Sequence, residues 1–279
     1  MLNESLCAMA INKPSLAAIH ARHPLRKAVA VWADENVEQA LIHQAVMPGD
    51  RVLELGTNAG RATIVAAECA GPTGRVVSAE ADPLKRKAAM AHAKRLTNID
   101  FVSALSESAS ARVALTRSGF IRGSPHLADR ATSSSSIGGV ATTPMARLQP
   151  PYFDVFVIDC EGCLDGLLPG LISHGLINRT RTIVLENDAV DAKAQANTHA
   201  SLGRLGFRPT VCIAHPALAW SEELRARCFF SVLQRTSSTR PIVTVTHAAG
   251  SDPPRMSRRE VDRYTKRAVE ETRCAVLPR

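Results

Sequence analysis

Aromatic side chains are scarce in this sequence. Phe, Tyr and Trp make up only 4% of the 279 residues, whereas hydrophobic residues together make up 45%. The core must therefore consist mainly of Ala, Leu, Val and Ile. The same scarcity argues against a surface on which the bases of single-stranded nucleic acid would stack. No run approaches the roughly 18 consecutive apolar residues of a transmembrane helix, so we expect no membrane-spanning segment.

The chain also lacks the cysteine pattern of a small secreted protein. Its seven cysteines are an odd number spread over a long sequence, which argues against a disulfide framework and favours a reducing compartment. We therefore expect a cytoplasmic protein in which Cys69, Cys212 and Cys228 are core residues. The N-terminus shows no basic start followed by an apolar run, which argues against a secretory signal. Its Ser, Ala and Arg content, with Glu4 as its one acid, leaves an organelle transit peptide open.

Acidic residues are in short supply, with 26 against 34 basic ones and a formal net charge of +8. Such an excess suggests an anionic partner. Residues 236–279, however, contain nine basic and five acidic residues, so this segment alone accounts for four of the eight excess charges. We interpret it as a basic C-terminal tail, and nucleic acid is not the partner that we expect.

The regular part of the chain alternates apolar strand patterns with helical patterns. This alternation predicts a doubly wound α/β fold, in which helices cover both faces of a mostly parallel sheet. We expect one domain at 36–235, after an N-terminal extension at 1–35. Within it, 106–150 is rich in Ser, Gly, Pro and Thr and is predicted to be a flexible insertion. Strands are expected at 51–55, 75–79, 99–104, 153–159, 181–186, 207–214 and 227–234, and helices at 36–46, 61–70, 82–96, 164–174 and 192–205.

Four predicted strands finish at or near an acid. The carboxyl ends of parallel strands meet at one edge of the sheet, and ligands of doubly wound sheets bind there. A single acid in this position is ordinarily a solvated strand end, but four of them beside a glycine-rich turn indicate a binding site. The four acids are Glu54, Glu80, Asp159 and Glu186.

The glycine-rich turn follows the first strand. Gly56 permits a tight strand-to-helix turn, and Gly60 lets the chain pack closely where the helix begins. In nucleotide-binding βαβ units the acid that ends the second strand, here Glu80, binds the ribose hydroxyls. An acid before the first glycine, Glu54, suits a ligand with an ammonium group better than one with a pyrophosphate. The spacing also differs from the GxGxxG of dinucleotide folds.

Four segments resemble those of class I S-adenosylmethionine-dependent methyltransferases. LELGTNAGRAT at 53–63 and SAEADPLK at 78–85 are similar to the first two motifs of that class. FDVFVIDCEGCLDGLLPGL at 153–171 resembles the DxEG segment of its FkbM family, and IVLEND at 183–188 resembles the acidic strand that follows. The resemblance spans about residues 36–235, with departures from the family pattern at Val157 and Asp165.

This resemblance implies a seven-stranded Rossmann-like sheet with one antiparallel strand near its C-terminal end. It also implies methyl transfer from S-adenosyl-L-methionine to a hydroxyl group of a small-molecule, sugar or lipid-like acceptor. Asp159 and Glu161 would lie where the acceptor meets the methyl group, as base or orienting group. The implied cofactor-binding residues are Glu54, Gly56, Thr57, Asn58, Gly60, Glu80 and Ala81.

Other functions for the same residues stay open. Asp159 and the pair Glu186 and Asn187 would end neighbouring strands and supply oxygen ligands suited to Mg²⁺ or Ca²⁺. This arrangement is similar to catechol-type O-methyltransferases, in which a metal lowers the pKa of the bound hydroxyl. Two further alternatives are N-methylation of nucleic acid or protein and nucleotide binding without catalysis.

Cys160-Glu161-Gly162-Cys163 has the CxxC spacing. Such a pair can be redox-active in a thioredoxin-like βαβ context, and two such pairs can bind zinc. We find neither that context nor a second CxxC in the sequence. We therefore interpret the spacing as a coincidence within the DxEG segment.

Overall fold

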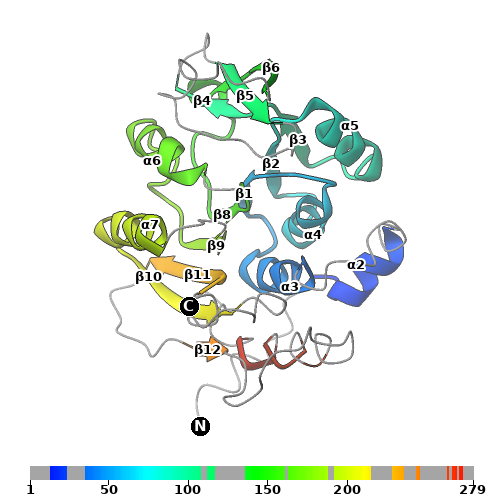
Figure 1. The fold of residues 1–279 in the computed structure, drawn as a ribbon. Helices are drawn as coiled ribbons and strands as arrows, with labels where there is room; N and C mark the ends of the chain where they lie inside the picture. The colour runs from blue at the N-terminus through cyan, green and yellow to red at the C-terminus, as the bar shows by residue number, and fades with distance from the viewer. Residues whose placement is uncertain are drawn as a thin grey trace.

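An eight-stranded sheet runs through the middle of the computed structural model in Figure 1, in the order β12-β10-β11-β9-β8-β1-β2-β3. The structure describes residues 13–23, 35–107, 112–116, 136–160, 163–187, 192–214, 228–235, 243–245, 263, 266–268 and 270–272. The strands of this sheet are β1 (Arg51–Leu55), β2 (Arg75–Ala79), β3 (Ile99–Val102), β8 (Val155–Ile158), β9 (Thr182–Glu186), β10 (Phe207–Ile213), β11 (Phe230–Arg235) and β12 (Val243–Val245).

The predicted doubly wound, mostly parallel sheet is confirmed. β1 lies parallel to both β2 and β8, and the parallel pairing continues to β3 on one side and β9 on the other. β11 is antiparallel to β9 and to β10, and it is the antiparallel strand expected at 227–234. The strand β12, parallel to β10, adds to the seven that were predicted. Its two valines, Val243 and Val245, form too short an apolar pattern to indicate a strand by themselves.

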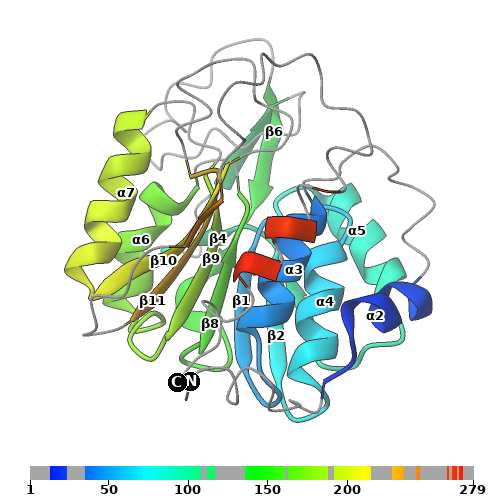
Figure 2. The same ribbon diagram turned by 90° about the horizontal axis from the view of Figure 1, so that it is seen from below.

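Strand side chains form an apolar layer on each face of the sheet. Val52 and Val155 lie in the layer that packs against α3 and α4, whereas Leu53 and Phe156 lie in the layer against α6 and α7. Figure 2 shows α6 and α7 on one side of the sheet and α3, α4 and α5 on the other. Burial on both faces explains why these strands are continuously apolar. The helices are α2 (Leu16–Arg22), α3 (Glu35–Ala45), α4 (Arg61–Ala70), α5 (Pro83–His92), α6 (Leu164–Ser173) and α7 (Ala192–Arg204).

Helix α5 begins as its sequence predicts. The Asp82 side chain accepts hydrogen bonds from the amides of Leu84 (2.8 Å) and Lys85 (3.3 Å), and Pro83 occupies the first turn. The helix ends at His92, earlier than expected. The chain then turns toward Asn98, whose side-chain amide donates to two carbonyl oxygens at the end of α4, and this anchor leads directly into β3.

Small sheets form where the flexible insertion is predicted. Met145 and Leu148, near the end of this segment, are buried in the apolar layer that also contains α6. This end of the segment therefore packs onto the domain. The elements are the parallel pair β4 (Leu105–Ser106) and β7 (Thr143–Pro144), the antiparallel pair β5 (Arg112–Thr116) and β6 (Ser136–Ala141), and the 3-10 turn η3 (Met145–Arg147).

Part of the basic segment 236–279 also packs against the domain. Besides β12, it contributes helical residues 266–268 and 270–272, in which Ala268 and Thr272 are fully buried. Ala268 belongs to the apolar layer of α3 and α4. Within the described residues, no helix has both the length and the hydropathy that a membrane crossing requires.

Within the part of the chain that the structure describes, two disulfides are present, contrary to expectation. Cys160 is bonded to Cys163 and Cys212 to Cys228, whereas Cys69 is free and buried as predicted. The antiparallel pairing of β10 with β11 aligns Cys212 with Ser231, and Cys228 lies just before β11. An odd total of cysteines could not indicate this pairing, because it depends on how distant segments align.

Candidate functional site

The register of the parallel strands brings the predicted acids to one edge of the sheet. Leu55 of β1 aligns with Ala79 of β2 and with Ile158 of β8. Ile158 in turn aligns with Leu185 of β9. The residues that follow these four along their strands are Gly56, Glu80, Asp159 and Glu186.

Only glycine fits at position 56. Its φ is +99°, and a Cβ there would lie 1.6 Å from the backbone oxygen of Asp159. Hydrogen bonds fix this close approach from both sides: the Gly56 amide donates to Ala79 (3.0 Å), and the Asp159 amide donates to Leu55 (2.9 Å). The turn after β1 is therefore packed directly against the chain that leaves β8.

The rest of the turn leads into α4. Asn58 adopts a left-handed conformation with φ +46°, and Gly60 follows with φ +84° at the N-cap of the helix. A Cβ on Gly60 would lie 2.9 Å from the Cβ of Ala89, so the glycine allows α5 to approach. Thr57 is buried, and its hydroxyl is hydrogen-bonded to that of Ser78 on β2. No side chain caps α4.

Glu80 joins the turn to the segment after β2. One carboxylate oxygen accepts from the Asn58 amide and the other from the Asp82 amide, each at 2.8 Å. Arg86 donates to the Glu80 backbone oxygen (2.6 Å), and the neighbouring Ala81 is buried. The carboxylate is 8% exposed and held in one orientation at the edge of the sheet.

Glu54 is a buried carboxylate with one unsatisfied oxygen. Its side chain is 1% exposed, and Oε2 accepts hydrogen bonds from the hydroxyls of Thr63 (2.6 Å) and Ser78. Oε1 is buried and has no hydrogen-bond partner. Burial raises the pKa of Glu54 to about 7, although the two hydroxyl donors act in the opposite direction. An approaching cation would favour the ionised form of this group.

A second group of acids lies along the same edge. One carboxylate oxygen from each of Glu38, Asp159 and Glu186 lies within 4.8 Å of the others. Our sequence analysis predicted Asp159 and Glu186 here and missed Glu38 of α3. Glu38 is 5% exposed among the buried residues Val37 and Ala40. An acid within an apolar helix pattern is the signal that could have revealed it.

The predicted metal ligand Asn187 follows Glu186 along the chain and contacts β11. The side-chain nitrogen of Asn187 donates to the backbone oxygen of Cys228 (2.7 Å) and to the Ser231 hydroxyl (2.8 Å), which ties Asn187 to β11. The structure adds Glu38 to the predicted acids Asp159 and Glu186. Glu161, the second predicted catalytic residue, lies outside the described residues.

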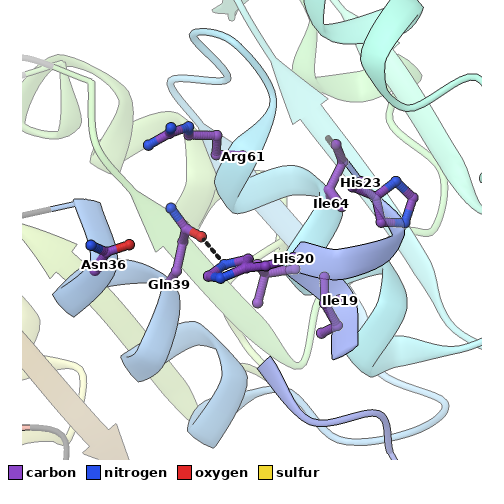
Figure 3. Close-up of a pocket in the computed structure, with 8 residues that line it drawn as sticks. Ile19, His20, His23, Asn36, Gln39, Arg61 and Ile64 are labelled. Carbon is purple, nitrogen blue, oxygen red and sulfur yellow. Dashed lines mark hydrogen bonds between the residues drawn. The ribbon is translucent and has the colours of Figure 1, made fainter. Parts of the chain in front are cut away.

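A small polar pocket lies between α2, α3 and α4 and was not predicted. Figure 3 shows the His20 ring pointing at the Gln39 side chain, with Nε2 and Oε1 2.7 Å apart. The pocket has a volume of about 60 Å³, which is room for about two water molecules. It is too small for a cofactor or a substrate. Its lining residues are Ile19, His20, His23, Asn36, Gln39, Arg61, Ile64 and Val65.

The comparisons with known proteins concern the fold alone. No protein-family model matches the chain, and a comparison with curated proteins finds no match. A cofactor-bound protein from MTB, Rv0187, is 22% identical, with 84% of this chain and 95% of that chain covered and a TM-score of 0.43. Fibrillarin from Aeropyrum pernix, in complex with natively bound S-adenosyl-L-methionine, is 11% identical over 72% and 76%, with a TM-score of 0.43. An S-adenosylmethionine-dependent O-methyltransferase from Thermotoga maritima is 14% identical over 82% and 74%, with a TM-score of 0.44.

Proposed function

We propose that the protein is an S-adenosyl-L-methionine-dependent methyltransferase. The observation that carries the proposal is Glu54, whose Oε1 is buried without a partner two residues before the glycine turn. A buried carboxylate oxygen is costly unless a donor or a cation reaches it. The ammonium group of S-adenosyl-L-methionine is such a donor, directly or through one water molecule. The residues present therefore fit this cofactor.

Glu80 would hold the ribose hydroxyls. Each of its carboxylate oxygens already accepts one backbone amide and keeps capacity for another hydrogen bond. Hydrogen bonds from neutral hydroxyls to an ionised group are strong, which suits recognition of a vicinal diol. Because the two amides hold the carboxylate in place, little side-chain freedom would be lost on binding.

The turn from Gly56 to Gly60 would support the methionine part of the cofactor. Because α4 begins without a side-chain cap, the amides of its first turn and its helix dipole favour an anion such as a carboxylate. The hydroxyl of Thr57 is engaged with Ser78, so its role would be to hold the turn rather than to contact the ligand. The buried Ala81 would contribute packing beside Glu80.

We further propose that the acceptor is a hydroxyl group of a small-molecule, sugar or lipid-like compound, as the FkbM resemblance implies. When bound, S-adenosyl-L-methionine supplies a methyl group on a sulfonium. Asp159 would take the proton of the acceptor hydroxyl as that oxygen attacks in line. Glu38 and Glu186 lie beside it, each with a carboxylate oxygen within 4.8 Å of an oxygen of Asp159. Glu161 is a second candidate for the same role.

A divalent cation is an alternative use of the acid group. Carboxylate oxygens are ligands that Mg²⁺ and Ca²⁺ prefer, and Glu38, Asp159 and Glu186 offer three of them. Such an ion would orient the acceptor hydroxyl and lower its pKa. Activity measured with and without EDTA separates this mechanism from direct proton transfer to Asp159.

Two measurements test the proposed function. Isothermal titration calorimetry should show binding of S-adenosyl-L-methionine and of its demethylated product, and absence of both would overturn the proposal. A labelled methyl donor, incubated with fractionated cell extract, should then label a small-molecule or lipid fraction. Label in RNA or protein would favour N-methylation instead, and binding without any transfer would favour a non-catalytic protein.

A further inference from the structure

We propose that the Cys160–Cys163 disulfide is a redox-active site, which a dithiol opens by thiol–disulfide exchange at Cys163. The proposal goes beyond methyl transfer and does not depend on it. The two Cα atoms are 5.4 Å apart, and the bond spans three positions in sequence.

The fold shows the strand and the helix on either side of the CxxC and the parallel return strand that completes a βαβ unit. β8 ends at Ile158, the CxxC follows one residue later, and α6 begins at Leu164. β9 then returns parallel to β8, so the disulfide lies at the strand-to-helix junction of a βαβ unit. CxxC pairs at the start of a helix are the setting in which cysteine reactivity is enhanced. The two cysteines of this spacing are bonded to each other in the structure.

The two sulfurs differ in access. Cys160 is 8% exposed, whereas Cys163 is half-buried and therefore the more accessible of the two. Cys163 is also the N-cap residue of α6, a ten-residue helix that no side chain caps. Helix N-termini stabilise a nearby negative charge, so an incoming thiolate and the later Cys163 thiolate are both favoured at this end.

The proposed thiol–disulfide exchange has two steps. A thiolate of the dithiol attacks the Cys163 sulfur, the S–S bond breaks, and the electron pair stays on Cys160, which takes up a proton. The second thiolate of the reductant then attacks the mixed disulfide and releases Cys163, which also takes up a proton. The dithiol leaves as its own disulfide, so two electrons and two protons have moved to the protein.

The second disulfide is a natural control. Cys212 and Cys228 are held from both sides, because the Phe229 amide donates to the Ile213 oxygen (2.9 Å) and Asn187 donates to the Cys228 oxygen (2.7 Å). Strand pairing beside it keeps this disulfide in place. We expect it to be the slower of the two to open.

The redox site adjoins the glycine turn of the proposed cofactor site. A Cβ on Gly56 would lie 3.3 Å from the Cα of Cys160, and the intervening Asp159 amide donates to Leu55. Opening the disulfide would release a constraint directly beside this turn. The balance of thiols and disulfides in the surrounding solution would thereby affect the edge of the sheet where the cofactor is proposed to bind.

The test uses the full chain and dithiothreitol as the dithiol. Samples are quenched with acid over time, free thiols are alkylated, and both disulfides are followed by peptide mass spectrometry. We expect Cys160–Cys163 to open about tenfold faster than Cys212–Cys228 and to re-form with oxidised dithiothreitol. Equal or slower opening, or failure to re-form, would overturn the proposal.

A matched pair of variants identifies the attacked sulfur. Cys160→Ser leaves Cys163 as a free thiol, and Cys163→Ser leaves Cys160. Iodoacetamide should alkylate Cys163 in the first variant about tenfold faster than Cys160 in the second. The reverse order would place the attack at the buried sulfur and contradict the mechanism. The wild-type measurement needs neither variant to fold.

Discussion

Replacing Glu54 by Gln should stabilise the ligand-free protein at neutral pH and weaken its binding of S-adenosyl-L-methionine. Glu54 is buried, and its pKa is raised to about 7 because burial disfavours the charged carboxylate. Gln carries no charge, and its amide oxygen can still accept from the hydroxyls of Thr63 and Ser78. The substitution therefore removes the cost of ionising a buried acid while it keeps the existing hydrogen bonds.

The size of the expected change in the free energy of unfolding follows from the linkage between protonation of Glu54 and folding. In the unfolded chain Glu54 ionises around its ordinary pKa of 4.5, whereas in the folded protein it resists ionisation until about pH 7. The unfolded state thus binds fewer protons between these values, and the free energy of unfolding falls as pH rises. The loss is about 1 kcal/mol at pH 5 and about 3 kcal/mol at pH 8, a difference of about 2 kcal/mol.

Urea unfolding at pH 5, 6, 7 and 8 measures this difference. The advantage of Glu54→Gln over wild type should grow by about 2 kcal/mol across this range. Asp100→Asn is the control, because Asp100 forms an exposed ion pair with Arg75 and such pairs contribute little. Its profile should run parallel to wild type. If the free energy of unfolding of Glu54→Gln also ran parallel to that of wild type over this pH range, burial would not be what raises the pKa of Glu54.

Cofactor binding supplies the second half of this prediction. Only ionised Glu54 attracts an ammonium group, so the apparent affinity of wild type should rise about eightfold between pH 6 and pH 7.5. In Glu54→Gln the affinity should be lower and nearly independent of pH over this interval. A pH-independent wild type would show that Glu54 does not face the ammonium group.

The remaining predictions concern the turn and the acids beside it. Glu80→Ala should weaken S-adenosyl-L-methionine binding by about 1.5–3 kcal/mol in titration calorimetry, and unchanged affinity would remove Glu80 from ribose binding. Asp82→Ala is its control and should lower the stability of the protein by only about 1 kcal/mol through the lost helix cap. Gly56→Ala should destabilise the protein by about 4 kcal/mol or more, because its Cβ would lie 1.6 Å from a backbone oxygen. In Gly49→Ala, with φ +88° and its nearest neighbour at 3.7 Å, urea unfolding should show a loss of about 1–2 kcal/mol, and equal losses would contradict the steric argument. EDTA should leave methyl transfer unchanged if Asp159 acts as the base; loss of activity that Mg²⁺ restores would establish the metal-dependent alternative.

Features whose cause is local could be predicted from the sequence. Asp82 and Pro83 start a helix because a cap and a fixed φ act within one turn of chain. Gly56 and Gly60 mark the turn because no other residue adopts their conformation without strain. The continuous apolar strands indicated burial on both faces, and with it the edge where Glu80 and the other acids meet.

Features that depend on contacts between distant segments could not be predicted. Glu38 reaches the acid group only because α3 packs against β9. The bond between Cys212 and Cys228 follows from the alignment of β10 with β11. β12 pairs with an edge that exists only once the sheet has formed.

The disulfide beside Asp159 and the carboxylate of Glu54 show which features the sequence determines and which depend on tertiary structure. The order of strands and helices, the glycine turn and the positions of the acids along the chain all follow from residue patterns, since backbone conformation and hydrophobic periodicity act over a few residues. Whether an acid is ionised, and whether a CxxC lies at a reactive helix start, was decided only by tertiary structure. Burial, hydrogen-bond donors and helix dipoles set the chemistry of these groups, and burial depends on segments that only the fold brings together.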